Sequence, residues 1–159
     1  MRQKSKQEKY LTAVWIFAVL STIGFIFGNS LMVASVSDAQ SGGFFVFFTE
    51  KLGLTFLTHH FVRKAAHFSE YALLGMEMCF GVRFRRFFLF EKSLGVVLAV
   101  GSGFLVALAD EFIQRFVPER GPSFADSLLD YAGFLTGALV LLGFFALLTY
   151  IKNKKQHKL

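Results

Sequence analysis

Sixteen consecutive residues, 94–109, carry no charge, and two adjacent carboxylates, Asp110 and Glu111, follow them directly. A helix needs about 20 apolar residues to cross roughly 30 Å of hydrocarbon, because each residue adds about 1.5 Å. The segment therefore predicts a membrane-spanning helix that ends in polar side chains. Composition agrees, because 54% of the 159 residues are hydrophobic and 22 are Phe, which is more than a soluble core of this size can bury.

Four segments of the chain are candidates for spanning helices, and together they predict an all-α integral membrane protein built as a four-transmembrane-helix bundle. The predicted spans are residues 10–27, 65–82, 94–116 and 128–151. The second is the least apolar because it carries His67, Glu70 and Glu77. We include it because its neighbours could not otherwise enter the membrane from alternate sides. Residues 1–159 are expected to form a single domain.

The distribution of Lys and Arg predicts the orientation of these helices. Three segments fall on one side and hold four basic residues each, namely the N-terminus, the connection after the second span and the C-terminus. The other side holds five, which are Lys51, Arg63, Lys64, Arg115 and Arg120. Because cytoplasmic segments carry the basic excess, both termini of this multi-pass cell-membrane protein are predicted to be cytoplasmic. The net charge of +6 is thus explained by topology, and no nucleic-acid partner is expected.

The connection between the first two spans, Gly28 to Val62, mixes Phe with occasional charges. Such a segment is typical of an interfacial helix lying over the outer end of the bundle. A partly inserted loop explains the same composition, because Phe favours the membrane interface in either case. The sequence leaves both interpretations open.

Polar residues gather at the ends of three spans that the topology places on the outer side. These residues are His67 and Glu70 in the second span, Asp110, Glu111 and Gln114 in the third, and Asp126 and Asp130 in the fourth. Residues three, four or seven apart share a helix face. On the fourth span the polar face continues inward as Gly133 and Gly137, a GxxxG pattern that lets helix backbones approach closely. The carboxylates are therefore predicted to face a helix interface.

Buried acids of this kind need partners, because inserting an isolated Asp near the centre of a spanning helix costs about 2.5–3.5 kcal/mol of free energy. The acids must be paired, protonated, hydrated or metal-bound. We expect Asp110 to face the helix interface and Glu111 to meet Arg115 or Arg120, since adjacent residues on a helix point in different directions.

Three motifs carry a resemblance to a known family. The stretches RKAAHFSEYALLG (63–75), DEFIQRFVPER (110–120) and DSLLDYAGFLTGAL (126–139) resemble the VanZ-like membrane proteins. The family pattern runs Lys-x-x-His-Phe-x-Glu-Tyr, then Asp-Glu-x-x-Gln-x-Phe-x-x-x-Arg, then Asp-x-x-x-Asn-x-x-Gly-x-x-x-Gly. Asp130 departs from it by standing where the pattern usually has Asn. The resemblance implies a role at the cell envelope, linked to resistance to the glycopeptide antibiotic teicoplanin.

We expect the polar residues to form an outer-leaflet pocket that binds an anionic envelope lipid or wall precursor. The residues expected to bind it are Arg63, Lys64, Tyr71, Glu111, Gln114, Arg120, Asp126 and Asp130. Arg120 is the strongest candidate for a phosphate, because a guanidinium can bind phosphate through two parallel hydrogen bonds.

Other functions remain open. A hydrolase or transferase acting on a polyprenyl-phosphate-type lipid would use His67, Glu70 and Asp110 as catalytic groups. A proton path would run through Glu70, Glu77 and Asp130, and the polar residues could instead only join helices. No metal or other cofactor is expected, although His67, Glu70, Asp110 and Asp126 together would suit zinc or manganese. The oligomeric state is open, with a homo-oligomer as one option.

Overall fold

The computed structural model is all-helical throughout the part of the chain that it describes. That part comprises residues 6–33, 36, 42–43, 45–51, 53, 58–83, 92–118, 120–121 and 123–156. The long helices are α1 (Lys6–Ser30), α3 (His59–Arg83), α4 (Lys92–Gln114) and α5 (Phe124–Gln156), and η1 (Phe47–Lys51) is a short π-helix. The four long helices correspond to the four predicted spans, and three of them extend beyond both of their predicted bounds. The exception is α4, which ends at Gln114 instead of 116.

Within the described residues, three helices are long and apolar enough to cross a membrane, namely α1, the 94–114 part of α4, and α5. The fourth, α3, has the length to span, since 25 residues correspond to about 37 Å. Its polar side chains make it less hydrophobic than the other three long helices. The structure thus supports a membrane protein with three apolar spans, and a fourth span through α3 stays a prediction.

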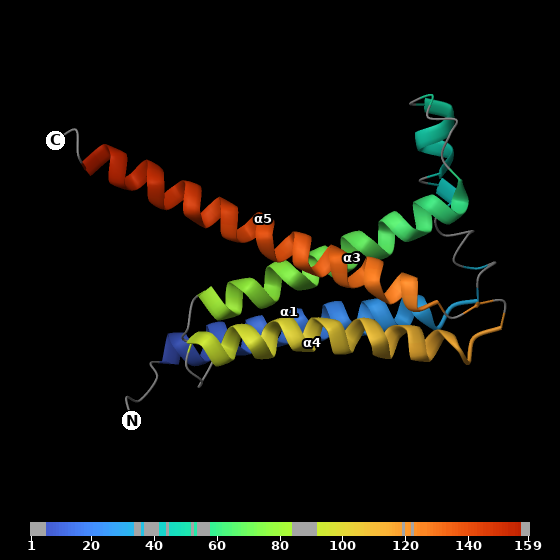
Figure 1. Cartoon of the computed structure of the whole chain (residues 1–159), viewed down its shortest axis with the longest axis horizontal. Helices are drawn as coiled ribbons and strands as arrows, with labels where there is room; N and C mark the ends of the chain where they lie inside the picture. The colour runs from blue at the N-terminus through green and yellow to red at the C-terminus, as the bar shows by residue number, and fades with distance from the viewer. Residues whose placement is uncertain are drawn as a thin grey trace.

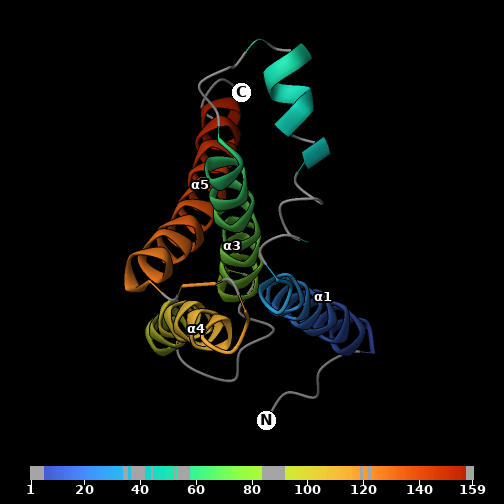
Figure 2. The same cartoon turned by 90° about the vertical axis from the view of Figure 1, so that its right-hand side faces the viewer.

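The least apolar helix lies at the centre of the bundle. Figure 1 shows α3 crossing α5 while α1 and α4 run beside each other. Figure 2 shows α3 between α5, α4 and α1, and α3 contacts each of these three helices. This arrangement follows from solvation, because polar side chains that face neighbouring helices avoid the hydrocarbon.

Glycines bring the backbones of α3 and α5 into direct contact. A Cβ atom added to Gly75 would lie closer than 3.0 Å to the carbonyl oxygen of Phe134. Gly137 has the same relation to the carbonyl oxygen of Ala72, and Gly133 to a carbonyl one turn earlier in α3. The GxxxG pattern therefore marks the helix interface, as predicted, and the α3–α5 crossing tolerates no side chain there.

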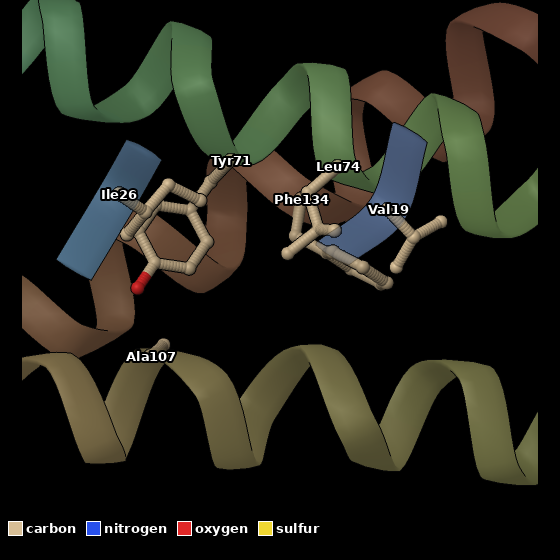
Figure 3. Packing of buried hydrophobic residues seen from close by; sticks show 6 residues of the cluster. All are labelled: Val19, Ile26, Tyr71, Leu74, Ala107 and Phe134. Carbon is tan, nitrogen blue, oxygen red and sulfur yellow. The ribbon is translucent and has the colours of Figure 1, made fainter. Parts of the chain in front are cut away.

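A small apolar core fills the space among the four helices (Figure 3). Its buried members are Val19 and Ile26 of α1, Tyr71 and Leu74 of α3, Ala107 of α4 and Phe134 of α5. By contrast, Phe17, Leu105 and Leu139 are each at least 65% exposed. Exposed apolar side chains of this size are the surface that a bilayer solvates.

Only part of the predicted interfacial segment is described. Its helical residues include η1, and the ring of Phe45 stacks on that of His59 with the centroids 3.8 Å apart. This contact attaches the segment to the start of α3. Other parts of the segment lie outside the described residues, and so do residues 84–91 of the basic connection after the second span.

A valine at Gly137 should separate α3 from α5. Since helix cores resist overpacking, Gly137→Val is expected to lower the free energy of unfolding by about 1–3 kcal/mol or more, measured by unfolding in mixed detergent micelles. The matched control is Gly143→Val on the same helix, where an added Cβ meets nothing within 4 Å, and its effect should stay within about 0.5 kcal/mol. Equal losses in the two variants would contradict the backbone contact.

Cysteine labelling tests whether α3 spans the membrane. In a Cys79→Ser background, His60→Cys at the start of α3 should react with a membrane-impermeant maleimide in intact cells. Lys92→Cys at the start of α4 should react only after the cells are permeabilised, because a spanning α3 puts the two sites on opposite sides. Labelling of both sites in intact cells would show that α3 does not cross the membrane.

Candidate functional site

A polar pocket of about 80 Å³ lies among α3, the start of α5 and the segment that joins α4 to α5. Seven residues predicted for the site line it, namely Arg63, Lys64, His67, Gln114, Arg120, Asp126 and Asp130. Its lining residues come from the N-terminal parts of α3 and α5, from the last residue of α4 and from the segment that follows it. Figure 1 shows α3 and α5 beginning on the side of the bundle where α1 and α4 end. Segments far apart in the sequence thus meet at one end of the bundle, because consecutive helices alternate in direction.

An ion pair joins the second turn of α3 to the first turn of α5 in the lining of this pocket. Lys64 Nζ lies 2.5 Å from Asp126 Oδ1, and both side chains are about one third exposed, at 37% and 33%. Asp126 occupies the first turn of α5, where the helix dipole favours a negative charge. A pair this exposed contributes only about 0–1 kcal/mol to stability, so its main effect is to hold the two groups in place.

The first helix closes the site through residues that sequence reasoning missed. Asn29 Nδ2 donates a hydrogen bond of 2.8 Å to Glu70 Oε1, and the Asn29 carbonyl accepts one of 3.0 Å from the Arg120 guanidinium. Gln114 Nε2 donates to Ser30 Oγ at 3.3 Å. The last carbonyls of a helix lack donors from a following helical turn, and the Asn29 carbonyl at the end of α1 accepts from both Arg120 and the Met32 N–H.

A signal for these two residues was present in the sequence. Asn29 and Ser30 follow the apolar run 10–27 after one glycine, at the same end of the bundle as the acids of α3 and α4. The three motifs that resemble VanZ-like proteins begin at residue 63 and do not include them.

Asp110 faces the interior, as predicted. The residue is fully buried, at 0% exposed, and its Oδ2 accepts a hydrogen bond of 3.2 Å from Gln114 Nε2 one helical turn further on. Its other oxygen, Oδ1, has no hydrogen-bond partner in the part of the chain that is described. Asp130 of α5 is 4% exposed. Two acids are therefore buried in one region of the bundle.

Glu111 is oriented differently from its neighbour and does not line the pocket. Its Oε1 accepts a hydrogen bond from the Ser123 backbone N–H, just before α5 begins. Within the described residues this N–H is its hydrogen-bond partner, instead of Arg115 or Arg120 as predicted. The reason is that the start of a helix presents unpaired N–H groups, and α5 begins beside the end of α4.

His67 and Glu70 lie close together but are not hydrogen-bonded to each other. The distance from His67 Nδ1 to Glu70 Oε2 is 3.9 Å, whereas a base and the group that orients it lie about 2.6–3.2 Å apart. Both atoms lack a hydrogen-bond partner among the described residues, and Glu70 is held through its other oxygen by Asn29.

A comparison with protein families matches residues 12–148 to the family model described as VanZ/LLP1. The chain belongs to the VanZ/LLP1 family. The match extends over most of the chain and includes α1, which the motif resemblance had left out. Searches of curated proteins and of solved structures each found no match.

Two polar residues of this VanZ/LLP1 chain lie deeper than the pocket. Tyr71, which was predicted to bind ligand, is fully buried in the apolar core, and its hydroxyl donates to the Val106 carbonyl at 3.4 Å. Glu77 accepts a hydrogen bond of 3.0 Å from Thr22 Oγ1, and its carbonyl accepts one of 2.8 Å from Trp15 Nε1. Both therefore join helices within the bundle.

A double-mutant cycle tests the contact between α1 and α3 at the site. Asn29→Ala and Glu70→Ala should show a coupling free energy of about 0.6–1.7 kcal/mol in reversible unfolding, the range of hydrogen bonds between spanning helices. The control cycle pairs Asn29→Ala with Glu77→Ala, about 10 Å further along α3, and should be additive within about 0.5 kcal/mol. An additive Asn29–Glu70 cycle would contradict the hydrogen bond.

Proposed function

We propose that this VanZ/LLP1 membrane protein binds the anionic headgroup of an envelope lipid or wall precursor in the pocket at the outer end of its helices. The observation that carries the proposal is the meeting of Arg63, Lys64 and Arg120 around one polar pocket. Guanidinium and ammonium groups are the side chains best suited to phosphate and carboxylate.

Arg120 is the central group in this proposal. Its hydrogen bond to the Asn29 carbonyl fixes the side chain before a ligand arrives. A charged group held in advance loses less conformational freedom when it binds. Gln114, which lines the same pocket, adds an amide oxygen that can accept from a hydroxyl of the ligand, while its amide nitrogen donates to Ser30 and Asp110.

The size of the pocket favours a headgroup over a whole ligand. About 80 Å³ is well below the roughly 300–1,000 Å³ of pockets that enclose drug-sized molecules. The hydrocarbon of a lipid would instead lie against the outside of the bundle. Phe116 and Phe124 are 73% and 63% exposed beside the ends of α4 and α5, and they offer an apolar surface close to the pocket.

Binding of this kind accounts for a link to teicoplanin resistance without chemistry on the antibiotic. A protein that holds a lipid-linked wall precursor at the outer leaflet changes how that precursor is presented to a glycopeptide. The interpretation requires only affinity for the precursor. It therefore fits a site in which His67 and Glu70 are not hydrogen-bonded to each other.

Removing the Arg120 charge should weaken lipid binding. For the purified protein and a polyprenyl phosphate, measured by native mass spectrometry, Arg120→Gln is expected to lower affinity about tenfold or more, since a charge-assisted contact contributes roughly 1.5–3 kcal/mol. Arg120→Lys should retain part of the affinity. The matched control is Arg115→Gln, an exposed arginine that does not line the pocket.

The outcomes separate the proposal from its main alternative. Equal affinity of the Arg115→Gln and Arg120→Gln proteins would contradict headgroup binding in this pocket. Cells carrying the intact chain should tolerate more teicoplanin than cells carrying Arg120→Gln, with lipid-linked intermediates unchanged in mass. A new lipid species that depends on the intact chain and disappears with Asp110→Asn would instead indicate a hydrolase or transferase.

A further inference from the structure

His67 of α3, Asp110 of α4 and Asp130 of α5 bring one potential metal-ligand atom each to within 4.8 Å of one another. The three residues come from three different helices, so only the assembled bundle creates this arrangement. We propose that they bind a divalent transition-metal ion, of the zinc or manganese class, between α3, α4 and α5. Metal binding requires no lipid and does not rest on the proposed function.

Unpartnered atoms point to a ligand at this position. Asp110 is fully buried, yet its Oδ1 has no hydrogen-bond partner among the described residues. The same holds for His67 Nδ1, on a side chain only 13% exposed. A buried acceptor without a partner costs about 1–3 kcal/mol, and more when it is charged. A metal ion bound by these side chains would give the buried Asp110 carboxylate a charged partner.

Charge favours a cation over a neutral ligand. Asp110 and Asp130 are both buried, at 0% and 4% exposed, and two nearby carboxylates repel each other in such a medium. The ammonium group of Lys64 lies against Asp126 instead. A divalent ion opposite two carboxylates gives a locally neutral site, which is the usual way in which buried charges are tolerated.

The donor set fits the proposed ions. One imidazole and two carboxylates are ligands that zinc and manganese accept. Ligand atoms around a tetrahedral zinc lie roughly 3.4 Å from one another, given metal–ligand distances of about 2.0–2.2 Å. The three ligand atoms lie within 4.8 Å of one another, so small side-chain rotations would bring them to this distance.

Gln114 acts as a positioning residue for this site. Its Nε2 donates to Asp110 Oδ2, which fixes the carboxylate and leaves Oδ1 available. Outer hydrogen bonds of this kind orient metal ligands. His67 and Asp130 also line the polar pocket, so the open coordination positions of the ion would face the place where we propose that a headgroup binds.

The structure changes the set of ligands that the sequence suggested. Asp126 is engaged by Lys64, and Glu70 is held by Asn29. Asp130 takes their place, at the position where the VanZ-like pattern usually has Asn. This chain therefore carries a second buried carboxylate where an amide would give a weaker, neutral ligand.

Metal uptake tests the proposal directly. The purified protein in detergent, without added lipid, is treated with a chelator, equilibrated with Zn²⁺ or Mn²⁺ and assayed by elemental mass spectrometry. The intact protein should retain about one ion per chain, and Asp110→Asn and Asp130→Asn should each weaken binding at least tenfold, since replacing a first ligand costs more than the roughly 10–100-fold loss seen for outer-shell changes. Glu77→Gln, another intramembrane acid of α3, is the matched control and should bind as the intact protein does.

Two results would overturn the site. One is an intact protein that retains neither ion, which would leave protonated carboxyl groups as the explanation for the buried acids. The other is unchanged binding in Asp110→Asn and Asp130→Asn. Should Asp110→Asn fail to fold, as judged by gel filtration, Asp130→Asn and His67→Gln decide the question. Because no lipid is present, failure here leaves headgroup binding untouched.

Discussion

Backbone contact between α3 and α5 is the constraint on which the rest of the structure depends. Gly133 and Gly137 of α5 lie against carbonyl oxygens of α3, and Gly75 of α3 lies against one of α5. The two helices run in the same direction (Figure 1), so the same faces continue outward from the glycines to Lys64 and Asp126. Small residues without Cβ atoms therefore do more than stabilise a crossing. They bring the N-terminal parts of two helices close enough to build one pocket.

The central position of α3 solves a solvation problem and creates a site at the same time. A helix that carries His67, Glu70 and Glu77 cannot expose that face to lipid, and three neighbouring helices cover it. Glu70 and Glu77 are each held by a residue of α1, through Asn29 and Thr22. Interhelical hydrogen bonds contribute only about 0.6 kcal/mol on average. Stability alone therefore explains poorly why so many polar groups are kept here, which supports the headgroup binding that we propose.

Helical periodicity predicted faces well and partners poorly. It placed Asp110 in the interior and the GxxxG pattern at an interface, and the structure confirms both. Glu111 was expected beside an arginine but accepts a hydrogen bond from the Ser123 N–H just before α5. The helical period of 3.6 residues per turn shows which face a residue is on, but it does not show which neighbouring residue lies opposite. Tyr71 was expected in the pocket but packs in the core. Asn29 and Ser30 were missed because polar residues at the end of an apolar run resemble an ordinary helix terminus.

Hydropathy and segment length alone establish the class of this protein, because crossing about 30 Å of hydrocarbon is a one-dimensional requirement that each helix meets by itself. Motif order likewise indicates the VanZ/LLP1 family. The grouping of His67, Asp110 and Asp130, and the closure of the pocket by α1, belong to the tertiary structure. They depend on how each helix is rotated and crossed against its neighbours, and that is decided by packing among all four helices. No single segment contains this information, so no single segment could have predicted the site.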